Sequence, residues 1–225
     1  MTIPICVSLP FGDVLQISKY LQSNASVSDY VEIRIDYLED TGGLFAITKK
    51  VQAPLIATNR PLSQGGKRSQ TETARVHRLL ETAKHGFTYV DIELNTPKLT
   101  SIINRLVEMN IKPIISYHDF QRTPSVSQLE KIVQLQMAVG AHVCKLVTTA
   151  KKLQDNFSCL SLVSKMKEKT NIVCFAMGQK GVLSRVFSPL FGAYFTYASV
   201  NQGLETASGQ LSIQRLKKIY DLLGV

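Results

Sequence analysis

Strand-like and helix-like segments alternate along the whole chain, and no other feature limits the possible folds as strongly. Runs of strand-forming residues predict eight strands at 3–9, 31–36, 54–60, 89–94, 113–118, 143–148, 171–176 and 194–198. Amphipathic segments predict helices at 13–21, 44–51, 71–85, 98–109, 126–139, 152–167, 180–190 and 212–223. Eight strands, each followed by a helix, predict an α/β fold, the (β/α)8 or TIM barrel, and 225 residues lie at the compact end of its size range.

The main competing architecture is a doubly wound open sheet, which usually carries a glycine-rich phosphate loop. The glycines of this chain match neither common form of that loop, and the turn at Gly65, Gly66 and Lys67 has the wrong spacing for either. No run of proline, glycine, serine or like charges interrupts the apolar pattern. We therefore expect a single barrel domain over residues 1–225.

Charged and apolar residues alternate within two of the predicted strands. Glu32, Arg34 and Asp36 share one face of the second strand, and Asp91 and Glu93 share one face of the fourth. Helices cover the outer face of a parallel barrel, so the charged face points inward. Buried charges are costly unless they are paired, which predicts an ion-pair network or a polar site inside the barrel.

Lys145 interrupts an apolar run at 143–147 that is typical of a strand buried on both faces. Burial disfavours a charged ammonium, and a neutral amine is the nucleophile that forms a Schiff base with a carbonyl compound. Alternatively, the stem packs in the strand and the amine reaches solvent at its end. The alternation in the other strands favours the nucleophile, because it places Lys145 in the interior with Glu32, Arg34 and His118.

The formal net charge is +9, but the basic residues are dispersed over predicted helices rather than gathered in a stripe. This pattern argues against a nucleic-acid partner and is consistent with a small anionic substrate. The apolar stretches fall short of the ~18 residues that span a membrane. The four cysteines show no paired spacing, which predicts free thiols, no bound metal and a cytoplasmic location.

Motifs at the ends of the predicted strands resemble those of the type I 3-dehydroquinate dehydratases, and the resemblance covers essentially the whole chain. They are Glu-Ile-Arg-Ile-Asp at 32–36, Thr-Asn-Arg at 58–60 with Gly-Gly at 65–66, Ser-Tyr-His-Asp-Phe at 116–120 with Thr-Pro at 123–124, Lys145, Met-Gly at 177–178, Ser-Arg at 184–185, and Gly-Gln at 209–210. Each motif alone is weak. Their shared order makes the resemblance specific.

The resemblance implies a hydro-lyase of the shikimate pathway, which leads to chorismate and the aromatic amino acids. Such an enzyme converts 3-dehydroquinate to 3-dehydroshikimate and water. Lys145 would form a Schiff base with the ring ketone, and the resulting cation would acidify the neighbouring C2 hydrogen. His118 would remove that proton and then deliver one to the departing hydroxyl. The same resemblance implies that no cofactor and no metal are needed.

The substrate carries a carboxylate and several hydroxyl groups. By the same resemblance, the planar guanidinium of Arg185 would bind the carboxylate through two oxygens. The other substrate contacts that the resemblance implies are Ser8, Glu32, Arg34, Arg60, Thr206 and Gln210.

The chain departs from the family pattern at three places: Gln64, the loop at 206–210, which lacks the usual proline, and His142, where the family commonly has an aspartate. Gln64 stands where a glutamate usually precedes the paired glycines, so it can hydrogen-bond His118 but cannot stabilise an imidazolium by charge. We therefore expect a lower pKa for His118 and slower turnover, unless Asp91 or Glu93 takes over that role. Thr206 stands where the family usually has serine and keeps the hydroxyl group.

Two other functions stay open at this point. A class I aldolase can also carry its lysine on the sixth strand, although a sugar-phosphate aldolase needs a phosphate site after strands seven and eight. A catalytically inactive relative that binds the metabolite for regulation is the second alternative. Family resemblance further suggests a homodimer, or a fusion to a shikimate dehydrogenase domain.

Overall fold

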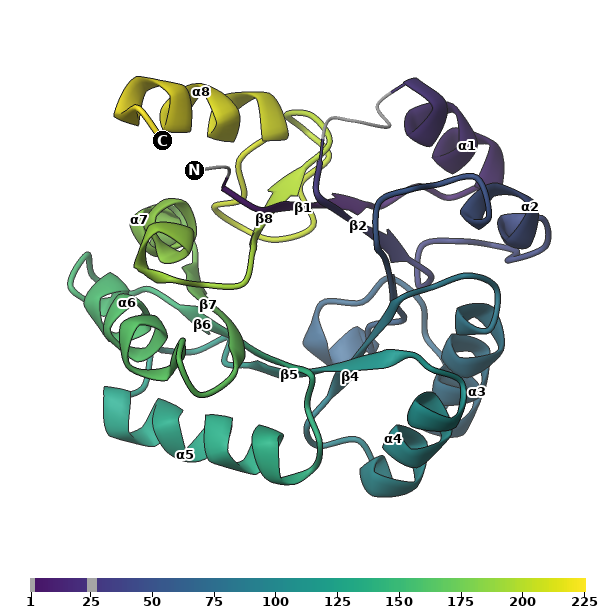
Figure 1. Cartoon of the computed structure of the whole chain (residues 1–225), viewed down its shortest axis with the longest axis horizontal. Coiled ribbons are helices and arrows are strands. Elements are labelled where there is room, and N and C mark those ends of the chain that lie inside the picture. The colour runs from purple at the N-terminus through teal and green to yellow at the C-terminus, as the bar shows by residue number, and fades with distance from the viewer. Residues whose placement is uncertain (1–2, 24–27) are drawn as a thin grey trace.

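The computed structural model describes residues 3–23 and 28–225 and arranges them as a barrel of parallel strands surrounded by helices (Figure 1). The strands are β1 (Ile5–Leu9), β2 (Tyr30–Arg34), β3 (Leu55–Thr58), β4 (Tyr89–Glu93), β5 (Lys112–His118), β6 (Val143–Thr149), β7 (Asn171–Met177) and β8 (Thr196–Ser199). The α-helices are α1 (Val14–Ser23), α2 (Leu44–Thr48), α3 (Glu72–Ala83), α4 (Leu99–Glu108), α5 (Val126–Ala138), α6 (Asp155–Met166), α7 (Val182–Phe187) and α8 (Ile213–Leu223).

Each strand from β1 to β6 pairs in parallel with the next one in the chain, and β1 also pairs with β8. β7 and β8 are the first and last strands in this order of pairing. A backbone hydrogen bond from Tyr194 N to Ile172 O (2.8 Å) links β7 to the segment that precedes β8. The predicted (β/α)8 barrel is therefore confirmed. Because all strands run the same way, the residues at their carboxyl ends gather at one rim.

One predicted helix is divided in the structure. The prediction at 180–190 corresponds to the 3₁₀ helix η2 (Gln179–Gly181), to α7 and to the 3₁₀ helix η3 (Ser188–Phe191). Pro189 lacks an N–H and its ring crowds the carbonyl four residues earlier, so the α-helical pattern ends before it. Another 3₁₀ helix, η1 (Leu62–Gln64), has no counterpart in the prediction, and it carries Gln64 to the rim of the barrel.

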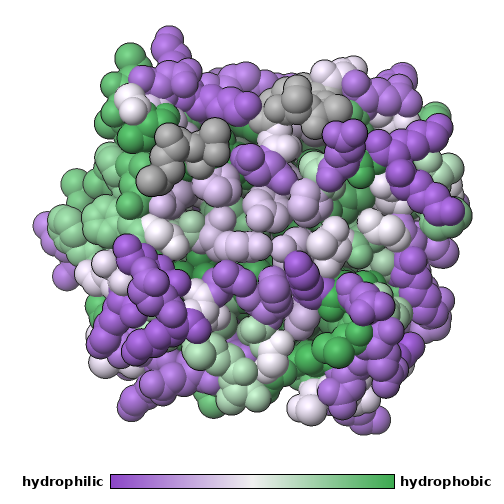
Figure 2. Space-filling model, in the orientation of Figure 1, coloured by the Kyte–Doolittle hydropathy of each residue, from purple (hydrophilic) through white to green (hydrophobic). Residues whose placement is uncertain are grey.

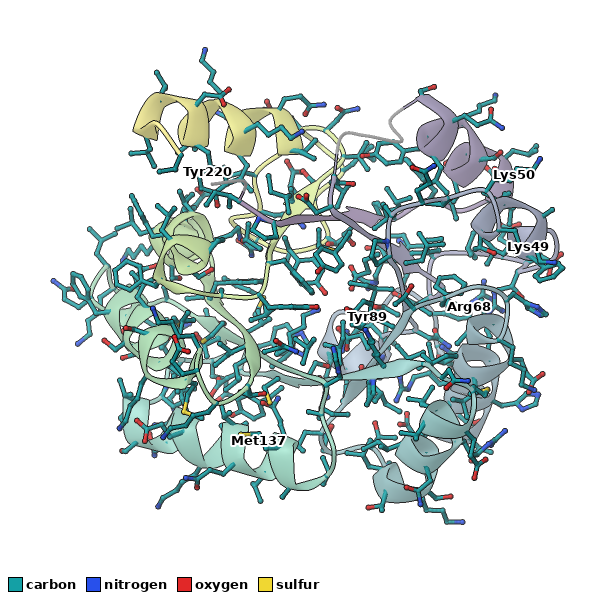
Figure 3. All side chains as sticks on the ribbon, in the orientation of Figure 1. Lys49, Lys50, Arg68, Tyr89, Met137 and Tyr220 are labelled. Carbon is teal, nitrogen blue, oxygen red and sulfur yellow. The ribbon has the colours of Figure 1, made fainter. Side chains whose placement is uncertain are left out.

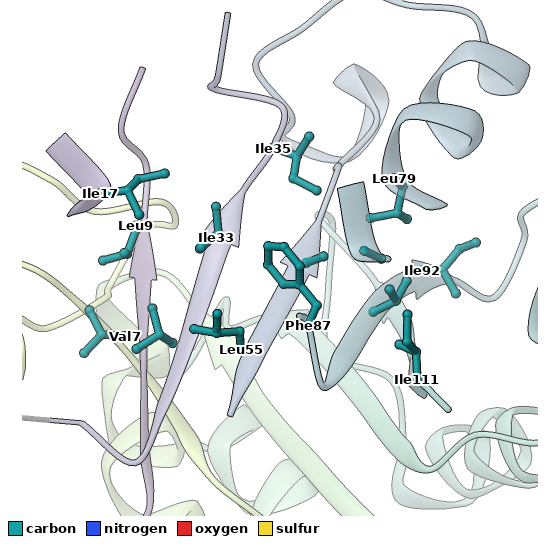
Figure 4. Close-up of a cluster of buried hydrophobic side chains, with 14 of the residues drawn as sticks. Val7, Leu9, Ile17, Ile33, Ile35, Leu55, Leu79, Phe87, Ile92 and Ile111 are labelled. Atoms are coloured by element: carbon teal, nitrogen blue, oxygen red, sulfur yellow. The ribbon is translucent and has the colours of Figure 1, made fainter. Parts of the chain in front are cut away.

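The apolar core lies mainly between the barrel wall and the helices. Leu9, Ile33 and Ile92 project outward from their strands and pack in one cluster with Ile17 of α1 and Leu79 of α3, all of them fully buried (Figure 4). A second cluster fills the barrel interior: Cys6, Ile56, Tyr89, Ile114, Val143, Val147, Val173, Phe175, Met177, Phe195 and Tyr197. This interior packing closes the barrel below the polar residues of the carboxyl rim.

Polar and charged side chains are spread over the face of the molecule seen in Figure 2. Lys49 and Lys50 extend outward next to α2, whereas Tyr89 lies inside the barrel (Figure 3). None of the helices within residues 3–23 and 28–225 combines the length and the apolar character that crossing a membrane requires. The cysteines, Cys6, Cys144, Cys159 and Cys174, are buried free thiols, as predicted.

Candidate active site

A cavity of about 340 Å³ opens at the carboxyl ends of the strands, a size typical of small-molecule sites. Nine of the ten predicted site residues line it: Glu32, Arg34, Arg60, Gln64, His118, Lys145, Arg185, Thr206 and Gln210. The tenth, Ser8, is fully buried behind Glu32. Its hydroxyl donates to Glu32 Oε2 (2.5 Å) and accepts from Thr206 Oγ1 (3.4 Å), so it supports two lining residues instead of facing the cavity.

Lys145 projects from β6 into the barrel and is only 4% exposed. Its Nζ lies 2.7 Å from Asp91 Oδ2 and 3.8 Å from Glu32 Oε1, and 4.1 Å from the centre of the Tyr197 ring. The amine therefore ends inside the cavity, and the alternative that it reaches outer solvent is wrong. The Asp91 carboxylate and the Tyr197 ring together fix the position of the amine.

Asp91 is the centre of a buried ion-pair network. Arg60 NH2 lies 2.7 Å from its Oδ2, and Ser116 Oγ donates to its Oδ1 (2.7 Å). Burial favours the neutral acid, but Arg60 and then Lys145 outweigh it and hold the pKa of Asp91 well below the usual range. Arg60 also bonds Glu93 Oε1 (2.6 Å). Its donors are therefore largely engaged with protein carboxylates, although its side chain also lines the cavity.

His118 ends β5, and its ring stacks at 6.0 Å on Phe120. Burial, and then the positive charges of Arg60 and Lys145, lower the pKa of His118 well below its ordinary value. The ring is therefore neutral at pH 7. The causes of this shift are burial and the neighbouring charges, and Gln64 is not among them. The expectation that glutamine in place of glutamate lowers the pKa of His118 therefore stays a prediction.

Gln64 reaches His118 because two glycines turn the chain after η1. Gly65 adopts φ +79°, and a Cβ on Gly66 would lie 2.0 Å from the carbonyl oxygen of Arg60. This turn places Gln64 Oε1 3.2 Å from His118 Nδ1. The predicted contact between the two side chains is thus present in the structure. Gln64 Nε2 in turn donates to Asn95 Oδ1 (3.2 Å).

Arg185 is a buried cation without a carboxylate partner among the described residues. It is 1% exposed, and its Nε and NH2 atoms have no hydrogen-bond acceptor. Its guanidinium carbon lies 4.2 Å from the centre of the Phe175 ring. Burial lowers the pKa of Arg185 from its ordinary value. A buried cation with idle donors at a cavity wall is suited to bind an anionic ligand.

Arg34 and the loop after β8 complete the wall. Arg34 makes a two-pronged pair with Asp36, with Nε to Oδ1 at 2.9 Å and NH2 to Oδ2 at 2.6 Å. In the loop, the Thr206 N–H donates to the side-chain Oε1 of Gln210 (2.7 Å). The side-chain Nε2 of Gln210 can then donate to a ligand. Gly209 adopts φ +76°, and a Cβ there would lie 2.4 Å from Gly178 O, so the loop packs directly on the end of β7.

Sequence reasoning missed two residues that contact Lys145 and one that contacts Gln64. Asp91 was expected in the interior, but not as the partner of Lys145, and Tyr197 and Asn95 carried no signal beyond their place near strand ends. In the part of the chain that the structure describes, no group of three or more histidine, cysteine, aspartate or glutamate residues could hold a metal ion.

Comparison with known proteins agrees with this arrangement. A family model described as Type I 3-dehydroquinase matches residues 5–225. A 3-dehydroquinate dehydratase of Dehalococcoides mccartyi is 34% identical over 220 residues, which cover 96% of this chain and 94% of the relative. The structure of 3-dehydroquinate dehydratase from Enterococcus faecalis superposes with a TM-score of 0.82 at 26% identity, covering 98% of this chain and 93% of the other.

A longer protein is also similar. The S. pombe structure described as dehydroquinate dehydratase and shikimate dehydrogenase superposes with a TM-score of 0.80 at 25% identity, and the match covers 100% of this chain but 45% of that one. The same barrel therefore occurs joined to a second enzyme in a related protein. The match of the family model over nearly the whole chain, with the 34% identical relative, shows that this chain belongs to the type I 3-dehydroquinase family.

Proposed function

We propose that this chain is a 3-dehydroquinate dehydratase that forms 3-dehydroshikimate and water through a lysine Schiff base, in the shikimate pathway. The observation that carries the proposal is the content of one cavity: the buried amine of Lys145, the neutral ring of His118 and the unpaired guanidinium of Arg185. These groups match a nucleophile, a base and an anion site. A cyclic keto acid needs all three.

The reaction begins with attack of Lys145 Nζ on the ring ketone. Loss of water leaves a protonated imine, which draws electrons from the ring and acidifies the hydrogen on the neighbouring C2. His118 takes that proton, and the enamine then expels the C1 hydroxyl as His118 returns a proton to it. Hydrolysis of the product imine frees Lys145. The reaction balances as one substrate to one product and one water, without a cofactor or a metal.

The state of His118 supports its role as the base. A base must be unprotonated at the working pH, and the pKa of His118 is lowered well below its ordinary value by burial and by nearby cations. Gln64 Oε1 accepts from Nδ1, so in the neutral ring the proton lies on Nδ1 and the lone pair on Nε2. We propose that Nε2 is the atom that moves the proton between C2 and the leaving hydroxyl.

Binding of the substrate is proposed to start from its carboxylate at Arg185. The Nε and NH2 donors of Arg185, which have no acceptor in the protein, can bind the two carboxylate oxygens, as in other bidentate pairs. Glu32, Arg34, Thr206 and Gln210 are proposed to contact the ring hydroxyls, with Ser8 and Arg60 holding their neighbours in place. This division differs from the expectation for Ser8 and Arg60, whose polar atoms are engaged with the protein.

We further propose that residues 1–225 form one catalytic barrel that works in the cytoplasm. The S. pombe protein joins a dehydroquinate dehydratase to a shikimate dehydrogenase, which supports a fusion of the same kind for this chain. The alternative that we propose is a homodimer of this chain. Size measurement of the purified chain by light scattering distinguishes a monomer from a dimer.

The test is a direct assay with 3-dehydroquinate. The product contains a conjugated carbonyl, so its formation raises ultraviolet absorbance continuously. Wild type should produce that signal, and the Lys145→Met and His118→Ala variants should not. A surface variant, Lys49→Met, serves as the matched control because Lys49 is exposed at the C-terminal end of α2. Absence of product with correctly folded wild type would overturn the proposal.

A further inference from the structure

A second cavity, of about 360 Å³, lies behind the loop that follows β8, between η2, α7 and the start of α8. Ala207, Ser208 and Gln210 line both this second cavity and the cavity that contains Lys145. The segment 207–210 is therefore a wall between two cavities of similar volume. A ligand in the second cavity would touch the back of the wall whose front carries a proposed substrate contact, Gln210.

This wall is a compact turn that is closed by its own hydrogen bonds. Thr206 N donates to Gln210 Oε1 (2.7 Å), and Gln210 N donates to Ala207 O (3.2 Å). The turn is attached to the end of β7 by the Gly178 N–H, which donates to Ser208 O (3.0 Å). Because its ends are bonded to each other, the turn should move as one unit. Contact with its back would then reach Thr206 and Gln210 together.

Two opposite charges line the second cavity without pairing with each other. Arg215 comes from the first turn of α8 and Glu205 from the loop, and among the described residues neither has a partner of opposite charge within 4.0 Å. Glu205 Oε2 accepts from the Gly203 N–H (2.9 Å). Val182 and Leu211 add apolar surface to the same cavity. A small zwitterion would satisfy both charges, because its carboxylate can bind the guanidinium and its ammonium group the carboxylate.

We propose that the second cavity binds an α-amino acid with an apolar side chain, and that this ligand strengthens binding of the substrate. Ile213 and Leu216 anchor α8 in the core, so a ligand that bridges Arg215 and Glu205 ties the loop to a fixed helix. A loop that is already held needs less ordering when the substrate arrives, which gives positive coupling. By linkage, the substrate must strengthen binding of the amino acid by the same factor. The coupling rests on the proposed function, whereas the site itself does not.

Three probes of similar size test the site: L-phenylalanine, 3-phenylpropionate, which lacks the ammonium group, and phenethylamine, which lacks the carboxylate. They carry a six-membered ring because the two cavities have similar volumes. Calorimetric titration should show that L-phenylalanine binds at least about tenfold more tightly than either of the others. Arg215→Met and Glu205→Gln should each weaken its binding at least about fivefold, since each removes a charge-assisted contact.

Lys217→Met is the matched control, because it removes an exposed positive charge from α8 at a position that does not line the cavity. It should leave the affinity unchanged. No binding of L-phenylalanine, equal binding of the three probes, or binding that survives both Arg215→Met and Glu205→Gln would overturn the site. The last result would also identify a probe that occupies the first cavity, where Arg185 can bind a carboxylate.

Kinetics and hydrogen exchange test the coupling. Saturating L-phenylalanine should lower KM for 3-dehydroquinate about fivefold with little change in kcat, and Arg215→Met should remove this effect. The probe should also slow amide exchange in peptides that cover 201–210. A KM that is unchanged or raised would overturn the coupling. If the chain lacked dehydratase activity but the probe still protected the loop in a manner that depends on Arg215, the site would stand and the proposed function would fall.

Discussion

Replacing Arg185 with methionine should move activity and stability in opposite directions. Arg185 is buried, its Nε and NH2 have no acceptor among the described residues, and its partial compensation is the Phe175 ring at 4.2 Å from the guanidinium carbon. Burying a cation costs several kcal/mol after relaxation, and a cation–π contact recovers about 2 kcal/mol of it. Methionine fills a similar volume and contacts aromatic rings without that cost.

From the burial cost and the cation–π gain we expect Arg185→Met to raise the free energy of unfolding of the ligand-free protein by about 2 kcal/mol. For a chain of this length, each kcal/mol shifts Tm by roughly 2–4 °C, so Tm should rise by about 4–8 °C. Activity should fall, because two charge-assisted hydrogen bonds to the substrate carboxylate contribute about 1.5–3 kcal/mol each. Their loss corresponds to a decrease in kcat/KM of about 10²- to 10⁴-fold.

Thermal unfolding by circular dichroism and the ultraviolet assay measure the two effects on the same samples. Arg185→Lys is the matched control, since it keeps a buried charge but lacks the planar fork. It should gain no stability and should lose part of the activity. A methionine variant that is less stable than wild type, or that keeps kcat/KM within tenfold, would refute the account of Arg185 as an unpaired cation reserved for an anion.

Three further perturbations test the surroundings of the catalytic pair. Gln64→Glu places a negative charge beside His118, which raises the pKa of His118 and moves the acid limb of the kcat/KM profile to higher pH; a superimposable profile contradicts this. Asp91→Asn leaves Lys145 and Arg60 without the charge between them, so urea unfolding should show a loss of about 3–5 kcal/mol, and a loss below 1 kcal/mol would speak against the network. The lowered pKa of His118 means that the folded state binds its proton less readily than the unfolded state, so wild-type stability should decline as pH falls below about 6.5. The His118→Gln variant should show a weaker decline, and parallel curves would exclude this contribution.

Much of the fold could be predicted because its causes are local. The alternation in segments such as 31–36 reports which face of a strand meets the helices, and helix caps are equally local: Ser125, for example, accepts from Gln128 N at the start of α5. The end of β3 was harder to predict. Arg60 leaves the strand because its N–H bonds the side chain of Asp36 (3.3 Å), a residue 24 positions earlier, and no local pattern encodes that contact.

The site shows the same division. That Asp91 and Lys145 face inward follows from the order of residues within each strand. That they touch at 2.7 Å depends on how far β4, β5 and β6 are staggered around the barrel, which is a property of the closed sheet. Asn95 is beyond sequence reasoning for a different reason, because a polar residue in a turn is usually solvated and its contact with Gln64 requires two loops to meet.

The central claim is that Lys145 forms an imine with the substrate, and reductive trapping tests it most directly. Wild type is treated with borohydride in the presence of 3-dehydroquinate, and digested peptides are analysed by mass spectrometry. We expect a stable ligand adduct on the peptide that contains Lys145, together with irreversible loss of activity. No adduct should form in Lys145→Met or without ligand. An active wild-type enzyme that yields no adduct, or an adduct on another lysine, would contradict the account.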